Sequence, residues 1–212
     1  NKTKIIDKTI TDLIRENQYM YNQKHTNDLP PFSGGVVGYL SYESVRWYED
    51  IHTHKNKMIP DSIFMLFKDV IAFDHINGDA IVISNVKINN DTSPDIQYKN
   101  AIDRIDQIGE LMHNRFEYRQ NPEQNSFSQK SNFTKSEFKK AVKKAKSYIR
   151  SGDIFQVVLS QKFERKTNSS STNLYRSLRR INPSPYLFHL KFDEFDIIGS
   201  SPEMMVNVNQ EV

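Results

Sequence analysis

The chain has 212 residues, of which 37% are hydrophobic, 26% charged and 11% aromatic, and this is the composition of an ordinary globular protein. It contains no cysteine, which excludes disulfides, thiolate catalysis and cysteine-containing zinc sites. The formal net charge of +3 does not indicate nucleic acid as a partner, and no apolar run reaches the ~20 residues of a membrane span. We therefore expect a cytoplasmic protein, with neither nucleic acid nor a membrane as partner.

The first part of the chain predicts one helix followed by strands. Apolar residues recur with helical spacing over residues 4–20. The run GGVVGYLSY, residues 34–42, is typical of a strand in the middle of a sheet, with glycines where another backbone or a large side chain approaches closely. Residues 62–75 and 80–88 predict two further strands, and the Asn-Gly turn between them at residues 76–79 favours an antiparallel hairpin.

A long helix and a polar stretch come next. Apolar residues with helical period over residues 95–118 predict a surface helix with one apolar stripe. That stripe consists of Ile102, Ile105, Ile108, Leu111 and Met112. Residues 121–132 are polar and nearly free of core residues, so we place a domain boundary there.

A helix and a buried strand are predicted after this boundary. Thr134, followed three residues later by Glu137, is a capping-box pattern that begins a helix ending near Gly152. Residues 153–164 are apolar on both faces, which predicts a strand buried on both sides of a sheet.

The last part of the chain adds a helix near residues 173–180 and a strand over residues 187–192. Further strands are expected in the runs DIIGS and MMVNV. Helices that alternate irregularly with hairpin-forming strands indicate the α+β class, with mixed, mostly antiparallel sheets and flanking helices.

Polar side chains within the predicted buried strand are candidates for a ligand site. Gln156 and Ser160 share one face with Ile154 and Val158, because side chains alternate along a strand. Buried polar groups need hydrogen-bonding partners. A bound polar ligand would satisfy them, and so would neighbouring side chains or ordered water.

The segment NPSPY, residues 182–186, predicts a stiff stretch of backbone with free carbonyl oxygens. Its two prolines fix φ and remove two N–H groups. Carbonyl oxygens accept hydrogen bonds from an ammonium group, and Tyr186, Leu187 and Phe188 offer contacts to a large apolar side chain. An amino-acid site is one interpretation, and an ordinary helix-to-strand turn is the other.

Three other patterns do not indicate a site. The lysines of the helix after Thr134 fit a solvated face better than a phosphate site, since no aromatic residues interleave with them. His52 and His54 lack further metal ligands nearby in the sequence. The GGVVG run has no Lys-Ser or Lys-Thr after it, which argues against a phosphate-binding loop.

Three blocks, in this order, resemble component I of anthranilate synthase, a chorismate-utilising enzyme family. They are PFSGGVVGYLSYE, FKKAVKKAKSYIRSGDIFQVVLSQKF and NPSPYLFHLKFDEFDIIGSSPE. The resemblance implies an enzyme that converts chorismate and ammonia, supplied by a glutamine amidotransferase subunit, to anthranilate and pyruvate with Mg²⁺. It also implies feedback inhibition by tryptophan. Aminodeoxychorismate synthase component I and a non-enzymatic amino-acid-binding module are the alternatives.

The resemblance also assigns positions in this sequence. It implies a tryptophan site formed by Asn182, Ser184, Pro185, Tyr186 and Leu187. Residues 1–130 correspond to an N-terminal regulatory region, and residues 131–212 to the first part of a chorismate-binding catalytic domain. The candidates for the substrate pocket are Gln156, Ser160 and Glu203. We expect the catalytic residues and the Mg²⁺ ligands beyond Val212, and the 212 residues alone to be inactive.

Overall fold

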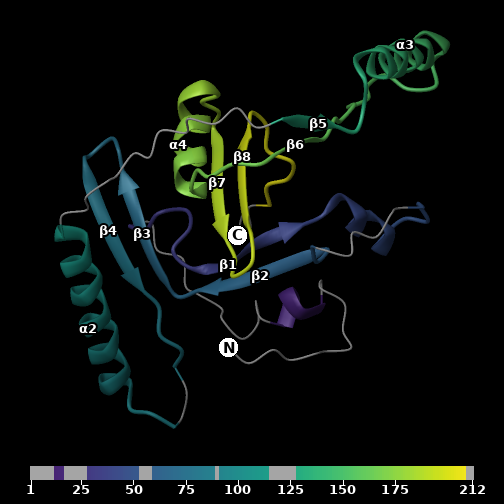
Figure 1. Ribbon diagram of the computed structural model, residues 1–212. Coiled ribbons are helices and arrows are strands. Elements are labelled where there is room, and N and C mark those ends of the chain that lie inside the picture. The colour runs from purple at the N-terminus through teal and green to yellow at the C-terminus, as the bar shows by residue number, and fades with distance from the viewer. Residues whose placement is uncertain (1–11, 17–27, 53–58, 89–90, 115–127, 209–212) are drawn as a thin grey trace. The chain divides into compact units, whose positions relative to one another are not determined.

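Figure 1 shows the computed structural model of the chain. It describes residues 12–16, 28–52, 59–88, 91–114 and 128–208. Residues 12–16 are helical, and the rest of the helix expected over residues 4–20 lies outside the described residues. The chain divides into two compact units, Asn1–Glu117 and Tyr118–Val212. The regulatory and catalytic roles of the two expected domains stay predictions.

The first unit contains the predicted glycine-rich strand. β1 (Gly35–Leu40) pairs antiparallel with β2 (Ser62–Phe67). Gly38 is required there, because a Cβ atom would overlap the Ile63 carbonyl oxygen and the Phe64 backbone and ring. Among the described residues β2 is the only strand beside β1, so the expectation of a central strand is wrong. The backbone and the ring that approach Gly38 closely both belong to β2.

The strand expected over residues 62–75 is two strands, because the chain changes its pairing partner at Lys68. β3 (Asp69–Asp74) follows the break and forms the predicted antiparallel hairpin with β4 (Asp79–Ser84). At the break, the backbone N–H and the side-chain amide of Asn85 both donate to the Lys68 carbonyl oxygen, each at 2.9 Å. These bonds satisfy a carbonyl group where the ladder stops.

The predicted surface helix packs beside this hairpin. α2 (Pro94–His113) contacts β4, as Figure 1 shows. Its buried residues are Gln97, Ala101 and Ile108, one helical face at spacings of four and seven. Ile102, Leu111 and Met112, which we expected in the apolar stripe, are exposed. The helix therefore forms as predicted, but its buried face lies nearer to Ala101 than the expected apolar stripe does.

The second unit contains the capping-box helix, which is confirmed in detail. In α3 (Lys135–Ser151), the Thr134 hydroxyl accepts from the Glu137 N–H at 3.2 Å, and the Glu137 carboxylate accepts from the Thr134 N–H at 2.8 Å. Gly152 ends the helix with φ of 82°, a left-handed conformation that glycine adopts without strain.

The strand predicted over residues 153–164 is wrong except at its end. β6 (Phe163–Arg165) pairs antiparallel with β5 (Gln129–Ser131). Residues 154–162 are not in a strand, and the Phe155 and Val158 side chains are 93% and 82% exposed. A strand forms only beside a partner, and among the described residues no strand pairs with this stretch.

The final hairpin and its helix confirm the helix predicted near residues 173–180 and the strands predicted in residues 187–192 and in DIIGS. β7 (Tyr186–Lys191) and β8 (Asp196–Ser201) are antiparallel, and α4 (Ser171–Ile181) packs against both (Figure 1). The strand expected in MMVNV is wrong, because residues 204–208 have no strand pairing and Met205 is exposed. The α+β class is confirmed. No helix in the described ranges has the length and apolarity to cross a membrane.

Candidate functional site

The Pro-Ser-Pro segment, residues 183–185, joins α4 to β7 and is anchored at the residue before it. Asn182 ends α4, and its N–H donates to the Leu178 carbonyl oxygen at 2.8 Å. Its own carbonyl oxygen accepts from the Ser200 hydroxyl at 2.8 Å. The Ser184 hydroxyl turns back to the Asn182 side-chain oxygen at 3.4 Å. The start of the segment is thus tied to both the helix and β8.

Beyond this anchor the backbone oxygens of the segment are open. The register that pairs Tyr186 with Ser201 would place Glu203 opposite Ser184. The Glu203 N–H instead donates to the Ser201 hydroxyl at 3.4 Å, which ends the ladder. Within the described part of the chain, no backbone N–H donates to the carbonyl oxygens of residues 183–185. These oxygens are therefore available to an ammonium group.

Aromatic rings continue from the segment along one face of the hairpin. Tyr186 and Phe188 share a face, because side chains alternate along β7, and Tyr186 is 44% exposed. The Phe188 ring lies across Gly199 of the facing strand, where a Cβ atom would overlap it. Leu187 is half-buried on the opposite face. The open oxygens and the two rings are thus neighbours in sequence.

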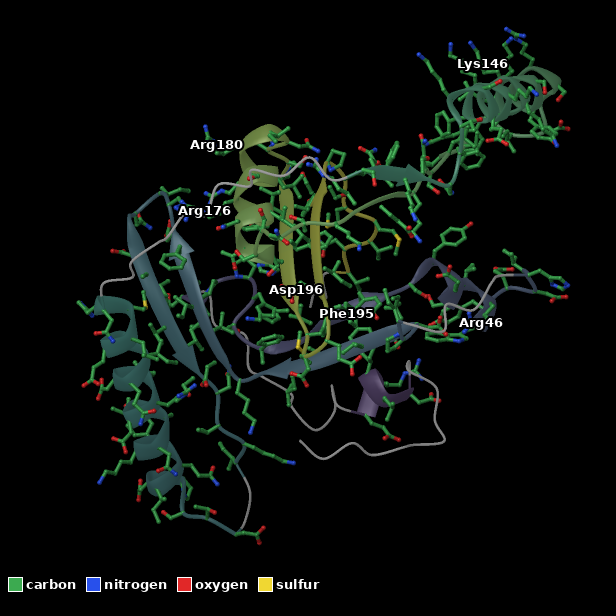
Figure 2. All side chains as sticks on the ribbon, in the orientation of Figure 1. Arg46, Lys146, Arg176, Arg180, Phe195 and Asp196 are labelled. Carbon is green, nitrogen blue, oxygen red and sulfur yellow. The ribbon has the colours of Figure 1, made fainter. Side chains whose placement is uncertain are left out.

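The other face of the hairpin is held to α4 by a polar cluster. His189 Nε2 lies 3.0 Å from Asp196 Oδ2, and these side chains are 18% and 17% exposed. The Tyr175 ring of α4 stacks on His189 with centroids 5.7 Å apart. Hydrogen bonds from His189 and then from Ser171 lower the pKa of Asp196, which Figure 2 labels beside Phe195. This cluster fixes the helix and the hairpin that the Pro-Ser-Pro segment connects.

The structure places the three substrate-pocket candidates at the surface. Gln156 and Ser160 are exposed on the unpaired stretch after α3. Glu203 is also exposed, and its backbone is held to Ser201 at the end of the hairpin, with the Ser201 hydroxyl donating to its carbonyl oxygen at 2.9 Å. The structure brings Glu203 near the end of the Pro-Ser-Pro segment through β8. The pocket assignment of all three stays a prediction.

Metal and phosphate sites were not expected in this chain. In the described ranges no group of three or more His, Cys, Asp or Glu side chains could hold a metal ion. His52 is exposed, and His54 lies outside those ranges. The lysines of α3, with Lys146 labelled in Figure 2, are exposed. Lys144 lies 5.6 Å from the centroid of the Tyr148 ring on the same helix.

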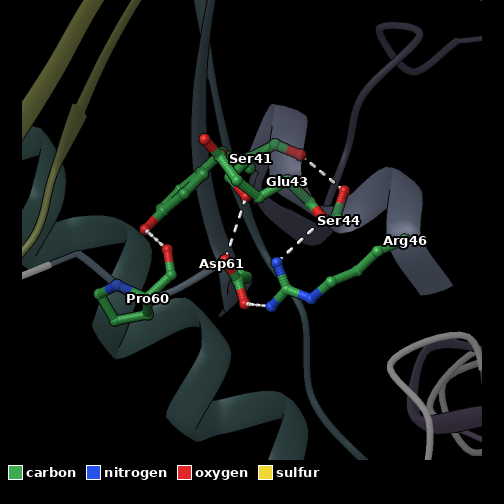
Figure 3. Close-up of polar contacts among 7 residues, drawn as sticks. Ser41, Glu43, Ser44, Arg46, Pro60 and Asp61 are labelled. Carbon is green, nitrogen blue, oxygen red and sulfur yellow. Dashed lines mark hydrogen bonds and ion pairs between the residues drawn. The ribbon is translucent and has the colours of Figure 1, made fainter. Parts of the chain in front are cut away.

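One polar cluster in the first unit was not predicted from the sequence. The short 3-10 helix η1 (Tyr42–Trp47) carries Arg46, whose guanidinium pairs with Asp61 and donates to the Glu43 carbonyl oxygen at 3.0 Å (Figure 3). The Ser41 N–H donates to the Asp61 carbonyl oxygen at 2.7 Å. These contacts close the connection between β1 and β2, a structural role. The two charges are fifteen residues apart in sequence, so no local pattern indicated the pair.

Ser200 and Ser201 were also missed, although they hold both ends of the candidate site. Their hydroxyls contact Asn182 and Glu203, respectively. For Ser201 the signal was available in the sequence, because serine hydroxyls readily bond to backbone groups a few residues away. The Ser200 contact joins residues 18 positions apart, so no local pattern indicated it.

The described units define an α+β protein in which an open Pro-Ser-Pro segment lies between a helix and an antiparallel hairpin. A family model described as chorismate binding enzyme matches residues 2–212. The chain therefore belongs to the chorismate-binding enzyme family, and the resemblance found in the sequence is confirmed.

The chain is similar to several proteins named as one component of a synthase. It is 41% identical over 194 residues to anthranilate synthase component 1 of Acetivibrio thermocellus, covering 87% of this chain and 39% of that protein. For the Aquifex aeolicus protein of the same name, identity is 35% over 193 residues, covering 88% and 38%. The chain thus spans about two fifths of the length of these curated relatives.

A solved structure shows the same arrangement of elements. The crystal structure of anthranilate synthase component I from Streptococcus pneumoniae TIGR4 aligns with a TM-score of 0.76 and 28% identity. The alignment covers 98% of this chain and 46% of that one. The mixed helical and antiparallel fold expected from the sequence is therefore confirmed.

Proposed function

We propose that this chain is part of the chorismate-using subunit of an anthranilate synthase, which converts chorismate and ammonia to anthranilate and pyruvate in tryptophan biosynthesis. The observation that carries the proposal is the family match over residues 2–212, together with relatives named anthranilate synthase component 1. The word component in those names supports the presence of a second subunit. We assign to this second subunit the supply of ammonia from glutamine, as a glutamine amidotransferase.

Mg²⁺ belongs to the proposal as a cofactor of the whole enzyme, whose cytoplasmic location is also proposed. The described residues do not fit a Mg²⁺ site, because none of their acidic side chains form a cluster that could hold a metal. We therefore assign the Mg²⁺ ligands to polypeptide corresponding to the unmatched part of the relatives.

The contribution that we assign to this chain is the binding of tryptophan as a feedback inhibitor. The open carbonyl oxygens of residues 183–185 would accept hydrogen bonds from the α-ammonium group. The Tyr186 and Phe188 rings would contact the indole on the face away from α4. Asn182 and Ser184 position the segment through their mutual contact, and Leu187 packs on the opposite face.

The test is a chimera in which this chain replaces the matched stretch of the Acetivibrio thermocellus relative. Incubated with chorismate, an ammonium salt and Mg²⁺, the chimera should release anthranilate, detected by fluorescence and identified by chromatography with pyruvate. The 212 residues alone should release none, because they span about two fifths of the relatives' length.

Two results would contradict the proposal. One is a folded chimera that leaves chorismate unchanged, while the unmodified relative is active under the same conditions. The other is formation of aminodeoxychorismate in place of anthranilate.

A further inference from the structure

The polar cluster between α4 and the final hairpin contains a pair of side chains whose attraction depends on pH. His189 Nε2 lies 3.0 Å from Asp196 Oδ2, and less than a fifth of either side chain is exposed. Histidine is the side chain whose charge ordinarily changes between about pH 5 and 8. Asp196 keeps its negative charge over that range, because the hydrogen bonds from His189 and Ser171 lower the pKa of its carboxyl group. The contact is therefore an ion pair at the acidic end of the range and a hydrogen bond from a neutral ring at the other end.

The groups that surround His189 do not change their charge over the same range. From α4, the Tyr175 ring stacks on His189, and the Ser171 hydroxyl donates to Asp196. In the hairpin, Lys191 lies opposite Asp196 and is exposed. The other charged side chains of α4 and of the hairpin are also exposed, namely Arg176, Arg179, Arg180, Asp193 and Glu194. Lysine, arginine and the carboxylates stay charged and tyrosine stays neutral between pH 5 and 8, so His189 is the group in this cluster whose charge varies.

The cluster is one of two polar anchors that hold α4 on the hairpin. Ser171 and Tyr175 belong to the first turns of the helix, and the second anchor is the Asn182 carbonyl oxygen, bonded to Ser200 after the last turn. In the described part of the chain no residue of α4 is fully buried, so apolar packing contributes little to holding the helix. A helix moves as a rigid element, and a looser anchor at its first turns therefore changes the tilt of its last turn.

The Pro-Ser-Pro segment cannot absorb such a change in tilt. Pro183 and Pro185 fix φ on both sides of Ser184, and the segment leaves α4 directly after its last turn. The open carbonyl oxygens therefore follow the helix, whereas the Tyr186 and Phe188 rings belong to β7. A ligand that contacts both the oxygens and the rings loses affinity when their relative position is less often correct.

We propose that the charge on His189 tunes the affinity of the proposed tryptophan site, which binds more tightly when His189 is protonated. This inference rests on the proposed function, because tryptophan is the ligand whose affinity it concerns. His189 is a positioning residue. It faces α4, on the opposite side of the hairpin from Tyr186 and Phe188, and acts on the ligand only through the held segment.

The experiment measures tryptophan inhibition of anthranilate formation between about pH 5 and 8 in the chimera with the Acetivibrio thermocellus relative. Each inhibited rate is divided by the uninhibited rate at the same pH. The tryptophan concentration for half-inhibition should rise by about threefold or more from the acidic end to the other, because an ion pair is replaced by a neutral hydrogen bond.

A pair of variants assigns the pH dependence to one histidine. His189→Gln keeps a donor to Asp196 but has no charge to gain, so its half-inhibition concentration should stay near the value of the parent chimera at the least acidic pH. His113→Gln, at an exposed histidine of α2 in the other unit, is the matched control and should keep the parent profile. Titration of tryptophan, chorismate or ammonium is common to all three proteins and cancels in the comparison.

Hydrogen exchange supplies a second measurement that needs no variant and no tryptophan. Protection factors, which correct for the intrinsic effect of pH on exchange, should fall by about threefold for the amides of β7 and β8 as pH rises over the same range. The amides of α2 serve as the internal reference and should keep their protection.

Three outcomes would overturn the inference. Inhibition with the same pH profile in the parent chimera and in His189→Gln would overturn it and leave the proposed tryptophan site in place. Protection of β7 and β8 that stays constant with pH would do the same, even if His189→Gln failed to fold. An active chimera that tryptophan does not inhibit at any pH would remove the proposed site and this inference together.

Discussion

Single side chains decide how the Pro-Ser-Pro segment is presented. The Ser200 hydroxyl satisfies the Asn182 carbonyl oxygen, so the oxygen just before the segment is already used by the protein. The Ser201 hydroxyl accepts from the Glu203 N–H, which would otherwise have reached Ser184 across the hairpin. The oxygens that stay open are thus selected by two serines, and the prolines supply the rigidity.

Tyr186 is the residue whose loss should weaken tryptophan inhibition most directly. In the chimera described above, Tyr186→Ala should raise the tryptophan concentration for half-inhibition by about tenfold, because an aromatic contact of roughly 1.4 kcal/mol is removed. Inhibition curves of anthranilate formation measure the effect. Tyr98→Ala, at an exposed tyrosine of α2, is the matched control and should leave the curve in place. Equal shifts in the two variants would remove Tyr186 from the site.

Asp196 should make the second unit less stable in acid. Its folded-state pKa is lowered by the hydrogen bonds from His189 and Ser171, so the unfolded chain binds a proton more readily than the folded one. The stabilisation is complete above the pKa of an unfolded aspartate and is lost as pH falls through the lowered value. Urea unfolding at a series of pH values should therefore show a destabilisation by Asp196→Asn that is largest near neutrality and shrinks in acid.

The control for this experiment is Asp193→Asn, at an exposed carboxylate in the turn between β7 and β8. It should change stability little at any pH in the series. If the two variants show the same dependence on pH, the contacts of Asp196 with His189 and Ser171 have no energetic role.

At the level of elements, the sequence predicted the features that are held by contacts between residues close together in the chain. The capping box of α3 lies within four residues, and the Asn-Gly turn between β3 and β4 lies within four as well, so both could be predicted from the sequence. The strand over residues 153–164 depends on a partner distant in sequence, and the apolar pattern alone could not supply one. The break at Lys68 is the same kind of nonlocal effect.

The capping box gives α3 a measurable part of its stability. Thr134→Ala removes the acceptor for the Glu137 N–H and should cost about 1 kcal/mol of helix stability. This corresponds to roughly fivefold faster amide exchange in the first turns of α3, measured by NMR or mass spectrometry. Ser136→Ala, at an exposed serine of the same turn, is the control and should leave exchange unchanged. Comparable acceleration in both variants would show that the cap contributes little.

At the scale of the whole chain, the second unit has apolar side chains that the described residues do not cover. Exposed apolar side chains gather after α3 and again at residues 204–208. Neither stretch is a strand, although both have the apolar patterns that predict one. More than half of each relative's length has no counterpart in this chain. In the relatives, that additional polypeptide is available to cover the corresponding apolar side chains. The proposed activity therefore belongs to an assembly larger than the 212 residues.

The sequence by itself determined the family, the helices α2, α3 and α4 and the tight hairpins, because each depends on residues a few positions apart or on motifs that lie in one run. Only the tertiary structure decided which carbonyl oxygens of the Pro-Ser-Pro segment stay open, that Arg46 pairs with Asp61, and that no described strand pairs with residues 154–160. Those outcomes depend on groups that are brought together, or kept apart, by packing between segments distant in the chain, where sequence periodicity carries no information.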